Sequence, residues 1–275
     1  MKWITVSRKM GTHGTEIARE VASALGWRCY DTKAIHRMAD ELGVLDSVVA
    51  IDEKAPSVIQ RVVSPRPMVY LERLASVIYE LARQGDAVFL GRGSHLLLRD
   101  FPCALHVRVT ASPETCLRTV AAPGLSREAA ARAIKRTDDE RSAFVRFAYG
   151  VDWEDPTRYD LVLNMDKLTV PLAVHTIVHL VRSPAIADAS ADALRTLSLL
   201  ALESRAEAAL SEATAGRLVF PALRVTAVAP GKVQVNGRVE TGGQKASVEN
   251  VLRAVKGVES VENLIEVVPV FRTGV

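Results

Sequence analysis

The stretch ITVSRKMGTHGTEIA, residues 4–18, decides the fold of the first part of the chain. It starts in the apolar run WITV at 3–6, which predicts a short strand, and continues into a helical pattern that Gly26 would end. Apolar residues four positions apart mark that helix: Ile17, Val21 and Leu25. Gly11 and Gly14 lie in the turn between strand and helix. Because glycine lets an anion approach the backbone N–H groups at a helix N-terminus, the turn predicts a phosphate-binding site.

This turn departs from the standard phosphate-binding loop, or P-loop. The standard pattern is G-x-x-x-x-G-K-[ST], in which the lysine contacts the terminal phosphates and the hydroxyl residue holds magnesium. Here Gly14 is followed by Thr15 and Glu16, so both functional residues are missing. Lys9, earlier in the turn, is a candidate substitute for the lysine. Taken alone, the segment is equally compatible with a plain strand-to-helix turn.

Three further apolar runs predict strands: AVFL at 87–90, ALHVRV at 104–109 and LVLN at 161–164. Ser112 and Pro113 are typical of a helix start after the second of these runs. Because the strands alternate with helices and are apolar on both faces, we expect a three-layer α/β fold with a parallel sheet. Ligands of such sheets bind at the carboxyl ends of the strands.

A second domain is indicated after residue 182. The stretch SPAIADASAD at 183–192 is small and polar, which favours a linker, so we expect domains at 1–182 and 193–275.

Beyond this linker we expect a helix at about 192–213 and two strands, around Val225 and Val233, joined by a Pro230-Gly231 turn. A following helix, ended by Gly257, would bury one face: Val248, Val251, Leu252 and Val255. A last strand at 260–268 would complete a small α+β unit, in which no catalytic set is evident.

Composition excludes several classes of function. With 275 residues, 48% hydrophobic and 24% charged, the chain is typical of a globular protein with two domains. A net charge of +3, dispersed basic residues and few aromatics argue against a nucleic-acid partner. No secretory or membrane-spanning run is visible, so we expect a cytoplasmic location. The three cysteines lack metal-ligand spacing and are interpreted as reduced and structural.

Four segments together resemble the cytidylate kinase-like family of P-loop nucleoside monophosphate kinases, over roughly residues 1–182. They are ITVSRKMGTHGTEIA, CYDTKAIHRMA, VFLGRGSHLLL and IKRTDDERSAFVRFAYGVDWEDPTRYDLVLN, in the family's order. The first is similar to the family's S-R-x-x-G-S-G-G, with His13 where the family has glycine. The third is similar to G-R-D, with Gly93 in place of the aspartate. The resemblance implies a P-loop kinase fold, ATP and Mg²⁺ as cofactors, and nucleotides as ligands.

The resemblance also implies roles for particular residues. Donor phosphates would be bound by the turn residues Lys9, Gly11, Thr12, His13, Gly14, Thr15 and Glu16. The acceptor would be bound by Asp31, Thr32, Arg37 and Arg92, because an arginine fork grips a monophosphate well. A lid helix would bring Arg136, Asp138 and Arg141 to the transferring phosphoryl group. No metal ligands are assigned.

The C-terminal unit resembles a BON domain over about residues 195–269, through Gly237, Val239 and the segment Gly257–Asn263. That family is associated with phospholipid surfaces or protein partners. The resemblance therefore implies a protein or lipid-surface partner for this unit, and a homo-oligomer is also open.

Two functions of different classes follow. The first is ATP-dependent phosphorylation of a nucleoside monophosphate, with an acceptor such as CMP or dCMP. The second is a catalytically degenerate, nucleotide-binding regulatory protein that signals through the BON-like domain. The absence of the P-loop lysine, together with His13 and Gly93, favours the second; the retained acceptor and lid arginines favour the first.

Overall fold

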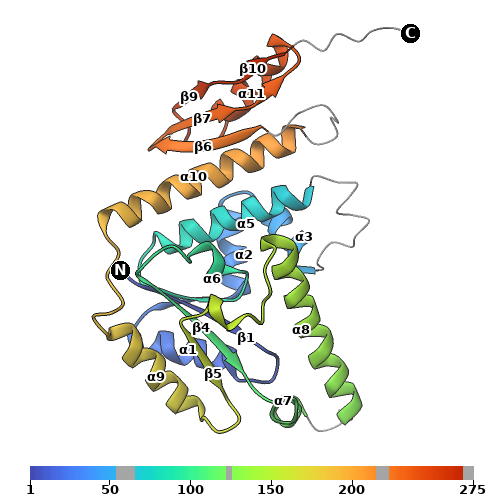
Figure 1. Cartoon of the computed structure of the whole chain (residues 1–275), viewed down its shortest axis with the longest axis vertical. Helices are drawn as coiled ribbons and strands as arrows, with labels where there is room; N and C mark the ends of the chain where they lie inside the picture. The colour runs from blue at the N-terminus through green and yellow to red at the C-terminus, as the bar shows by residue number, and fades with distance from the viewer. Residues whose placement is uncertain (54–65, 122–125, 215–222, 269–275) are drawn as a thin grey trace. The chain divides into compact units, whose positions relative to one another are not determined.

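The computed structural model describes residues 1–53, 66–121, 126–214 and 223–268 of the chain (Figure 1). They form two compact units, Met1–Met38 with Gln84–Ala193, and Ala39–Arg83 with Leu194–Val275. Among the described helices, none combines the length and apolar character that crossing a bilayer requires. The predicted domain limits at 182 and 193 stay a prediction.

The first unit is built on a five-stranded sheet. Its strands are β1 (Trp3–Arg8), β2 (Arg28–Tyr30), β3 (Ala87–Leu90), β4 (Ala104–Thr110) and β5 (Leu161–Asn164). They lie in the order β2-β3-β1-β4-β5 and every neighbouring pair is parallel. The α/β parallel sheet expected from the sequence is confirmed, and so are its four predicted strands. Strand β2 was not predicted, because three residues carry no recognisable apolar pattern.

The apolar core of this unit lies between the sheet and two helices, α1 (Gly14–Leu25) and α9 (Val170–Arg182). The two helices lie side by side against the sheet (Figure 1). Ile4 and Val6 of β1 face this core, where they meet Ile17 and Val21 of α1. Helix α1 ends at Gly26 in the left-handed conformation, as predicted.

The alternate residues of β1 and β4 point to the other face of the sheet, where the polar side chains of Thr5, Ser7 and Arg108 are buried. Arg108 is 3% exposed, donates to the carbonyl oxygen of Trp153 at 2.8 Å, and lies 4.2 Å from the Trp153 ring centroid. The Trp153 indole N–H donates to the Ser7 hydroxyl at 2.7 Å. Buried charge is tolerated here because it is hydrogen-bonded and stacked on aromatic rings. Trp153 and Tyr159, both buried, are therefore packing residues.

Five further helical segments complete the first unit: α2 (Thr32–Glu41), which starts there, α6 (Ser94–Leu97), α7 (Pro113–Val120), α8 (Arg127–Tyr149) and a 3₁₀ turn at Pro156–Arg158. Ser112 caps α7 and Ser126 caps α8, each accepting the hydrogen bond of a backbone N–H three residues ahead. These caps fix where each helix starts relative to the carboxyl edge of the sheet.

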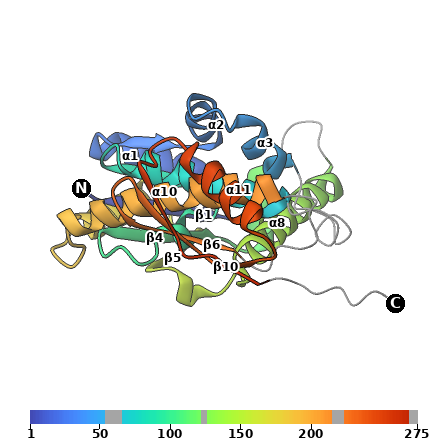
Figure 2. The same cartoon turned by 90° about the horizontal axis from the view of Figure 1, so that it is seen from above.

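The second unit contains α3 (Leu45–Glu53), α5 (Arg66–Ala82), α10 (Ala191–Thr214), which starts just before it, and the C-terminal elements. These are β6 (Arg224–Ala229), β7 (Lys232–Asn236), β8 (Arg238–Val239), α11 (Gly242–Arg253), β9 (Ser260–Asn263) and β10 (Glu266–Val267). Helices α10 and α11 share one apolar cluster with β6 and β7 (Figures 1 and 2). The helix predicted at 192–213 and the hairpin around Pro230-Gly231 are confirmed.

Two details of this unit correct the sequence predictions. The final strand predicted at 260–268 is two strands: β9 pairs with β7, and β10 pairs with β8 in a separate sheet. The chain turns between them, where the Ile265 N–H donates to the side chain of Asn263 at 3.3 Å. Helix α11 ends at Arg253, so Val255 lies beyond it and Gly257 does not end it.

Strand β6 has one edge covered by carboxylates of α10. The backbone N–H of Val225 donates to Glu207 at 2.6 Å, and that of Ala227 donates to Glu203 at 2.9 Å. A third carboxylate, that of Glu72 on α5, faces the same pair. Burial, together with Glu207 and Glu203, raises the pKa of Glu72 although the Ser204 hydroxyl opposes the shift.

Candidate functional site

The glycine turn joins β1 to α1 at the carboxyl edge of the sheet. Gly11 has φ 80°, and a Cβ there would lie 2.6 Å from the carbonyl oxygen of Cys116 on α7. Gly14 opens α1, and a Cβ there would lie 2.4 Å from the Cβ of Arg8. Both contacts are shorter than any side chain tolerates, so the turn can be built only with glycine at these two positions.

The N-terminus of α1 is left without a side-chain cap. His13 occupies the capping position with φ 56°, in the left-handed region, and makes no capping hydrogen bond. Its Nδ1 instead lies 2.9 Å from the Glu16 carboxylate, one turn along the helix. Uncapped N–H groups at a helix start, with the positive end of the helix dipole, suit an anion.

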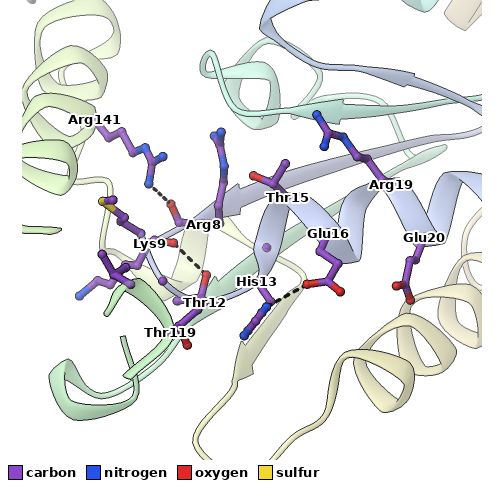
Figure 3. Close-up of a pocket in the computed structure, with 14 residues that line it drawn as sticks. Arg8, Lys9, Thr12, His13, Thr15, Glu16, Arg19, Glu20, Thr119 and Arg141 are labelled. Carbon is purple, nitrogen blue, oxygen red and sulfur yellow. Dashed lines mark hydrogen bonds and ion pairs between the residues drawn. The ribbon is translucent and has the colours of Figure 1, made fainter. Parts of the chain in front are cut away.

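Two other turn residues have structural tasks. Thr12 is buried, and its hydroxyl donates to the carbonyl oxygen of Lys9 at 2.8 Å. The Lys9 ammonium lies 2.5 Å from the carboxylate of Glu154 and points away from Thr15, which stands where the P-loop lysine would be (Figure 3). In this structure Lys9 therefore does not substitute for that lysine.

Helix α8 brings two of the three predicted lid residues to the turn. Asp138 accepts a hydrogen bond from the backbone N–H of Met10 at 2.9 Å, and Arg141 donates to the carbonyl oxygen of Arg8 at 3.0 Å. Arg141 and Asp138 also pair at 3.2 Å. Burial raises the pKa of Asp138, against the opposing effects of Met10 and Arg141. Arg136 is exposed and does not line the pocket over the turn.

Arg92 follows β3 in an unusual backbone conformation. Gly91, Arg92 and Gly93 have φ of 77°, 59° and 69°, three left-handed residues in succession. The Arg92 guanidinium donates to the Thr32 hydroxyl at 3.4 Å, and burial lowers its pKa to about 10. A non-glycine residue at φ 59° is strained, which is common where a side chain must be aimed at a ligand.

Gly93, which replaces the family's aspartate, is explained by packing. A Cβ at this position would lie 2.2 Å from the ring of Tyr149, at the end of α8. The Tyr149 hydroxyl donates to the carbonyl oxygen of Arg92 at 3.4 Å. The ring therefore occupies the space that an aspartate side chain would need.

The remaining acceptor candidates lie at the start of α2. Asp31 accepts from the Ala34 N–H at 3.1 Å and pairs with Arg19 at 3.2 Å. Although burial opposes it, these partners lower the pKa of Asp31. Arg37 is exposed on α2. The structure thus brings Thr32 and Arg92 together, whereas the Arg37 side chain is exposed to solvent.

A pocket of about 520 Å³ opens over the glycine turn (Figure 3). It is lined by the turn itself, the first two turns of α1, Thr119 and Val120 at the end of α7, and Arg141. Glu16 is the carboxylate nearest the turn in this lining. In the described part of the chain, no group of three or more His, Cys, Asp or Glu side chains could hold a metal ion. The residues fit Mg²⁺ only in the usual kinase manner, through one or two carboxylates plus the phosphates and water.

Arg8 is the site residue that the sequence predictions missed. It ends β1, lines the pocket, and has its guanidinium against Gly91, where an added Cβ would lie 2.6 Å from Nη1. Burial first, then Arg141 and Arg92, lower its pKa to about 9. The sequence did carry a signal, because Ser7-Arg8 matches the S-R of the family motif.

Comparison with known proteins identifies two families in the chain. A model described as the cytidylate kinase-like family matches residues 3–167, and one described as the BON domain matches residues 200–269. No curated protein matches the chain.

Solved structures with the same fold include an uncharacterized protein from Eubacterium ventriosum ATCC 27560. It has a TM-score of 0.54 at 18% identity, over 66% of this chain and 99% of that one. Shikimate kinase from Bacteroides thetaiotaomicron has a TM-score of 0.40 at 12% identity, over 66% and 99%. A sugar kinase from Janibacter sp. HTCC2649 has a TM-score of 0.41 at 14% identity, over 69% and 99%.

The parallel sheet and its glycine turn form a P-loop kinase fold, and the C-terminal region carries a BON domain. Residues 3–167 make up more than half of the 275 residues. The chain therefore belongs to the cytidylate kinase-like family.

Proposed function

We propose that this protein transfers the terminal phosphoryl group of ATP to a nucleoside monophosphate, with CMP or dCMP as the acceptor. The observation that carries the proposal is that Arg141 of α8 and Arg92 after β3, two arginines from separate elements, both act on Arg8 at the end of β1. Phosphoryl transfer needs little from a protein beyond positioning and positive charge, and this arrangement offers both.

Each substrate has a site in this proposal. The donor phosphates lie on the uncapped start of α1, between Gly11 and Gly14, where the pocket opens. Glu16 holds Mg²⁺, directly or through water, and the ion neutralises phosphate charge when it is bound. The acceptor phosphate is bound by Arg92, with Thr32 and Asp31 beside it and Arg37 closing over it from α2.

The lid residues have distinct tasks in this proposal. Arg141 faces the turn, whereas exposed Arg136 would reach the phosphates only when α8 moves further over the pocket. Asp138 is a positioning residue, because it holds Met10 and Arg141 in place. We infer a cytoplasmic location, and we expect the BON domain to contact a protein or lipid-surface partner or to support a homo-oligomer.

A second candidate is a nucleotide-binding regulator without turnover. The observation that favours it is the Lys9–Glu154 ion pair at 2.5 Å, which leaves the turn without a lysine directed at the phosphates. In other enzymes, removing one group that stabilises the charge of the transition state costs about 2.7–4 kcal/mol. Binding would survive such a loss more readily than turnover.

A coupled ADP-release assay with ATP, Mg²⁺ and each of CMP, dCMP, UMP, AMP and GMP tests the proposal. We expect turnover with one acceptor, lost in Arg92→Ala and retained in Arg132→Ala, because Arg132 is exposed on α8 and does not line the pocket. Calorimetric titration of the same nucleotides runs in parallel. Binding of ATP without turnover for any acceptor would reject the kinase and favour the regulator.

A further inference from the structure

The Arg8 side chain is held in place by two glycines. Its Cβ and Cγ lie over Gly14 at the start of α1, 2.4 and 2.9 Å from where a Cβ would be. Its Nη1 lies against Gly91, directly before Arg92. Figure 3 shows the side chain extending away from the His13–Glu16 pair, with Arg141 beside it. Arg8 therefore connects the donor-phosphate turn with the arginine proposed for the acceptor.

Positive charge gathers around Arg8. Burial first, then the guanidinium groups of Arg141 and Arg92, lower its pKa to about 9, and the carboxylate of Asp138 opposes them. Like charges brought together in a partly buried place suit an anion.

The hydrogen bonding of Arg8 points the same way. Its Nε is buried and has no hydrogen-bond partner among the described residues. Buried donors are nearly always satisfied, and an arginine offers a fixed fork that matches phosphate oxygens. Neither Thr15 nor the ion-paired Lys9 brings a cation to this place.

We propose that Arg8 and Arg141 form a subsite for one anionic phosphoryl group, with Arg92 on its acceptor side, and that Arg8 binds the terminal phosphate of ATP in place of the missing P-loop lysine. The proposal deepens the proposed function and rests on it. It makes Arg8, the arginine of the Ser7-Arg8 pair, a catalytic residue.

The chemistry suits a site made of cations alone. An oxygen of the acceptor's ionised phosphate forms a new P–O bond to the terminal phosphorus, while the bond to the bridging oxygen breaks and ADP leaves with that electron pair. No proton has to move, because both phosphates are already ionised. The equatorial oxygens of the transferring group carry negative charge. The protein must therefore supply positive groups that face them.

Calorimetric titration of ATP and of ADP, each with Mg²⁺, tests the subsite without requiring turnover. The wild-type chain should bind ATP about 10- to 100-fold more tightly than ADP, the range of one hydrogen bond to a charged group. Arg8→Met, which keeps the length and removes the charge, should lose most of that ratio and leave the ADP affinity within about threefold. The matched control Arg132→Met, on an exposed arginine of α8, should keep the ratio.

Arg8→Lys separates charge from packing. Lysine keeps the positive charge but not the fork, so Arg8→Lys should keep part of the preference for ATP. If Arg8 were merely structural, every folded variant would show the same ratio of ATP to ADP affinity. Thermal melting of each variant identifies any that fail to fold, and if Arg8→Met fails, Arg8→Lys decides. An unchanged ratio in the folded Arg8 variants, or a wild-type chain that binds ATP no more tightly than ADP, overturns the subsite.

The two proposals fail differently. If the wild type shows no turnover with any acceptor, yet its preference for ATP depends on Arg8, the kinase proposal falls and the subsite stands. If turnover occurs and is unchanged in Arg8→Met, the subsite falls and the kinase proposal stands.

Discussion

The guanidinium of Arg141 donates a hydrogen bond to the backbone carbonyl oxygen of Arg8 at 3.0 Å, and so fastens helix α8 to the end of β1. Asp138, one turn earlier, accepts from the Met10 N–H at 2.9 Å and pairs with Arg141. The glycine turn is thereby shaped by a helix more than 120 residues further along the chain. A change in either residue should reach the phosphate site through the backbone of the turn.

Replacing Asp138 by alanine should weaken both folding and nucleotide binding. The Met10 N–H loses its acceptor and the three arginines lose their neighbouring carboxylate. We expect a loss of about 1–3 kcal/mol in unfolding free energy, measured by urea denaturation. Asp138→Asn keeps an acceptor for Met10 and should lose less. Equal losses in the two variants would contradict the assigned hydrogen bond.

Restoring the family's aspartate, Gly93→Asp, should destabilise the chain rather than improve it. The new Cβ would lie 2.2 Å from the Tyr149 ring, at φ 69°. Overpacking costs about 1–3 kcal/mol, in addition to the cost of the backbone conformation. Gly150→Ala is the matched control, since Gly150 also has φ 69° but nothing lies within 4 Å of its added Cβ.

Thermal and urea unfolding should show a clearly larger loss for Gly93→Asp than for Gly150→Ala. Adding Tyr149→Ala should recover part of the difference, because the clashing ring is then gone. A Gly93→Asp chain as stable as the Gly150→Ala control would show that the ring does not occupy this space.

Stability should fall on mild acidification because His95 is buried as the neutral form. Its ring stacks on Tyr159 at 4.8 Å, and burial, followed by His106 and two arginines, lowers its pKa from 6.5 to about 3. The folded state thus binds this proton less readily than the unfolded state. The contribution of neutral His95 to the free energy of unfolding is complete above pH 6.5. It is lost as the pH falls toward 3, by at most about 1.4 kcal/mol per pH unit for one group.

Urea denaturation between pH 7 and pH 4 measures this slope. His95→Phe keeps the stacked ring and should flatten the acid side of the profile, whereas His179→Phe, at an exposed position on α9, should not. A profile for His95→Phe as steep as that of the wild type would assign the acid sensitivity to other groups.

Glu72→Gln should stabilise the second unit at neutral and alkaline pH. The pKa of Glu72 is raised in the folded state, so its contribution is present below the unfolded value of 4.5 and is lost as the pH rises through the folded value. Glutamine keeps the hydrogen bond to Ser204 without charge beside Glu203 and Glu207. We expect a gain on the order of 1 kcal/mol at pH 8 and little change at pH 4.

Urea denaturation at those two pH values is the measurement, and Glu41→Gln, at an exposed position on α2, is its control. An equal gain in unfolding free energy at pH 4 and pH 8 would mean that the negative charge of Glu72 does not destabilise the folded state.

The sequence predicted what depends on local pattern. The glycine turn, four of the five sheet strands, helix α10 and the β6–β7 hairpin follow from apolar spacing and turn residues. Strand β2 is too short for a pattern, and the break between β9 and β10 falls inside an uninterrupted run, where Asn263 turns the chain. Strand β2 depends on tertiary pairing that no local signal encodes, whereas Asn263 is a local turn signal that the sequence prediction did not use.

The sequence predicted which residues make up the site better than it predicted how their side chains are arranged. Which cations face the turn depends on distant partners: Glu154 draws Lys9 away, and Arg92 and Arg141 surround Arg8. Arg37 and Arg136, assigned from the resemblance, are exposed and stay predictions. Arg8 itself was visible in the motif but could be valued only once its burial and its neighbours were known.

The transfer of label from γ-phosphate-labelled ATP to the acceptor tests the central claim most directly, because ADP release alone does not separate transfer from hydrolysis. With Mg²⁺ and CMP or dCMP, we expect label in the nucleoside diphosphate, in amounts equal to the ADP formed, and a loss of about 100- to 1,000-fold in Arg8→Met. Label that appears only as inorganic phosphate, or no transfer to any nucleoside monophosphate, would contradict the account.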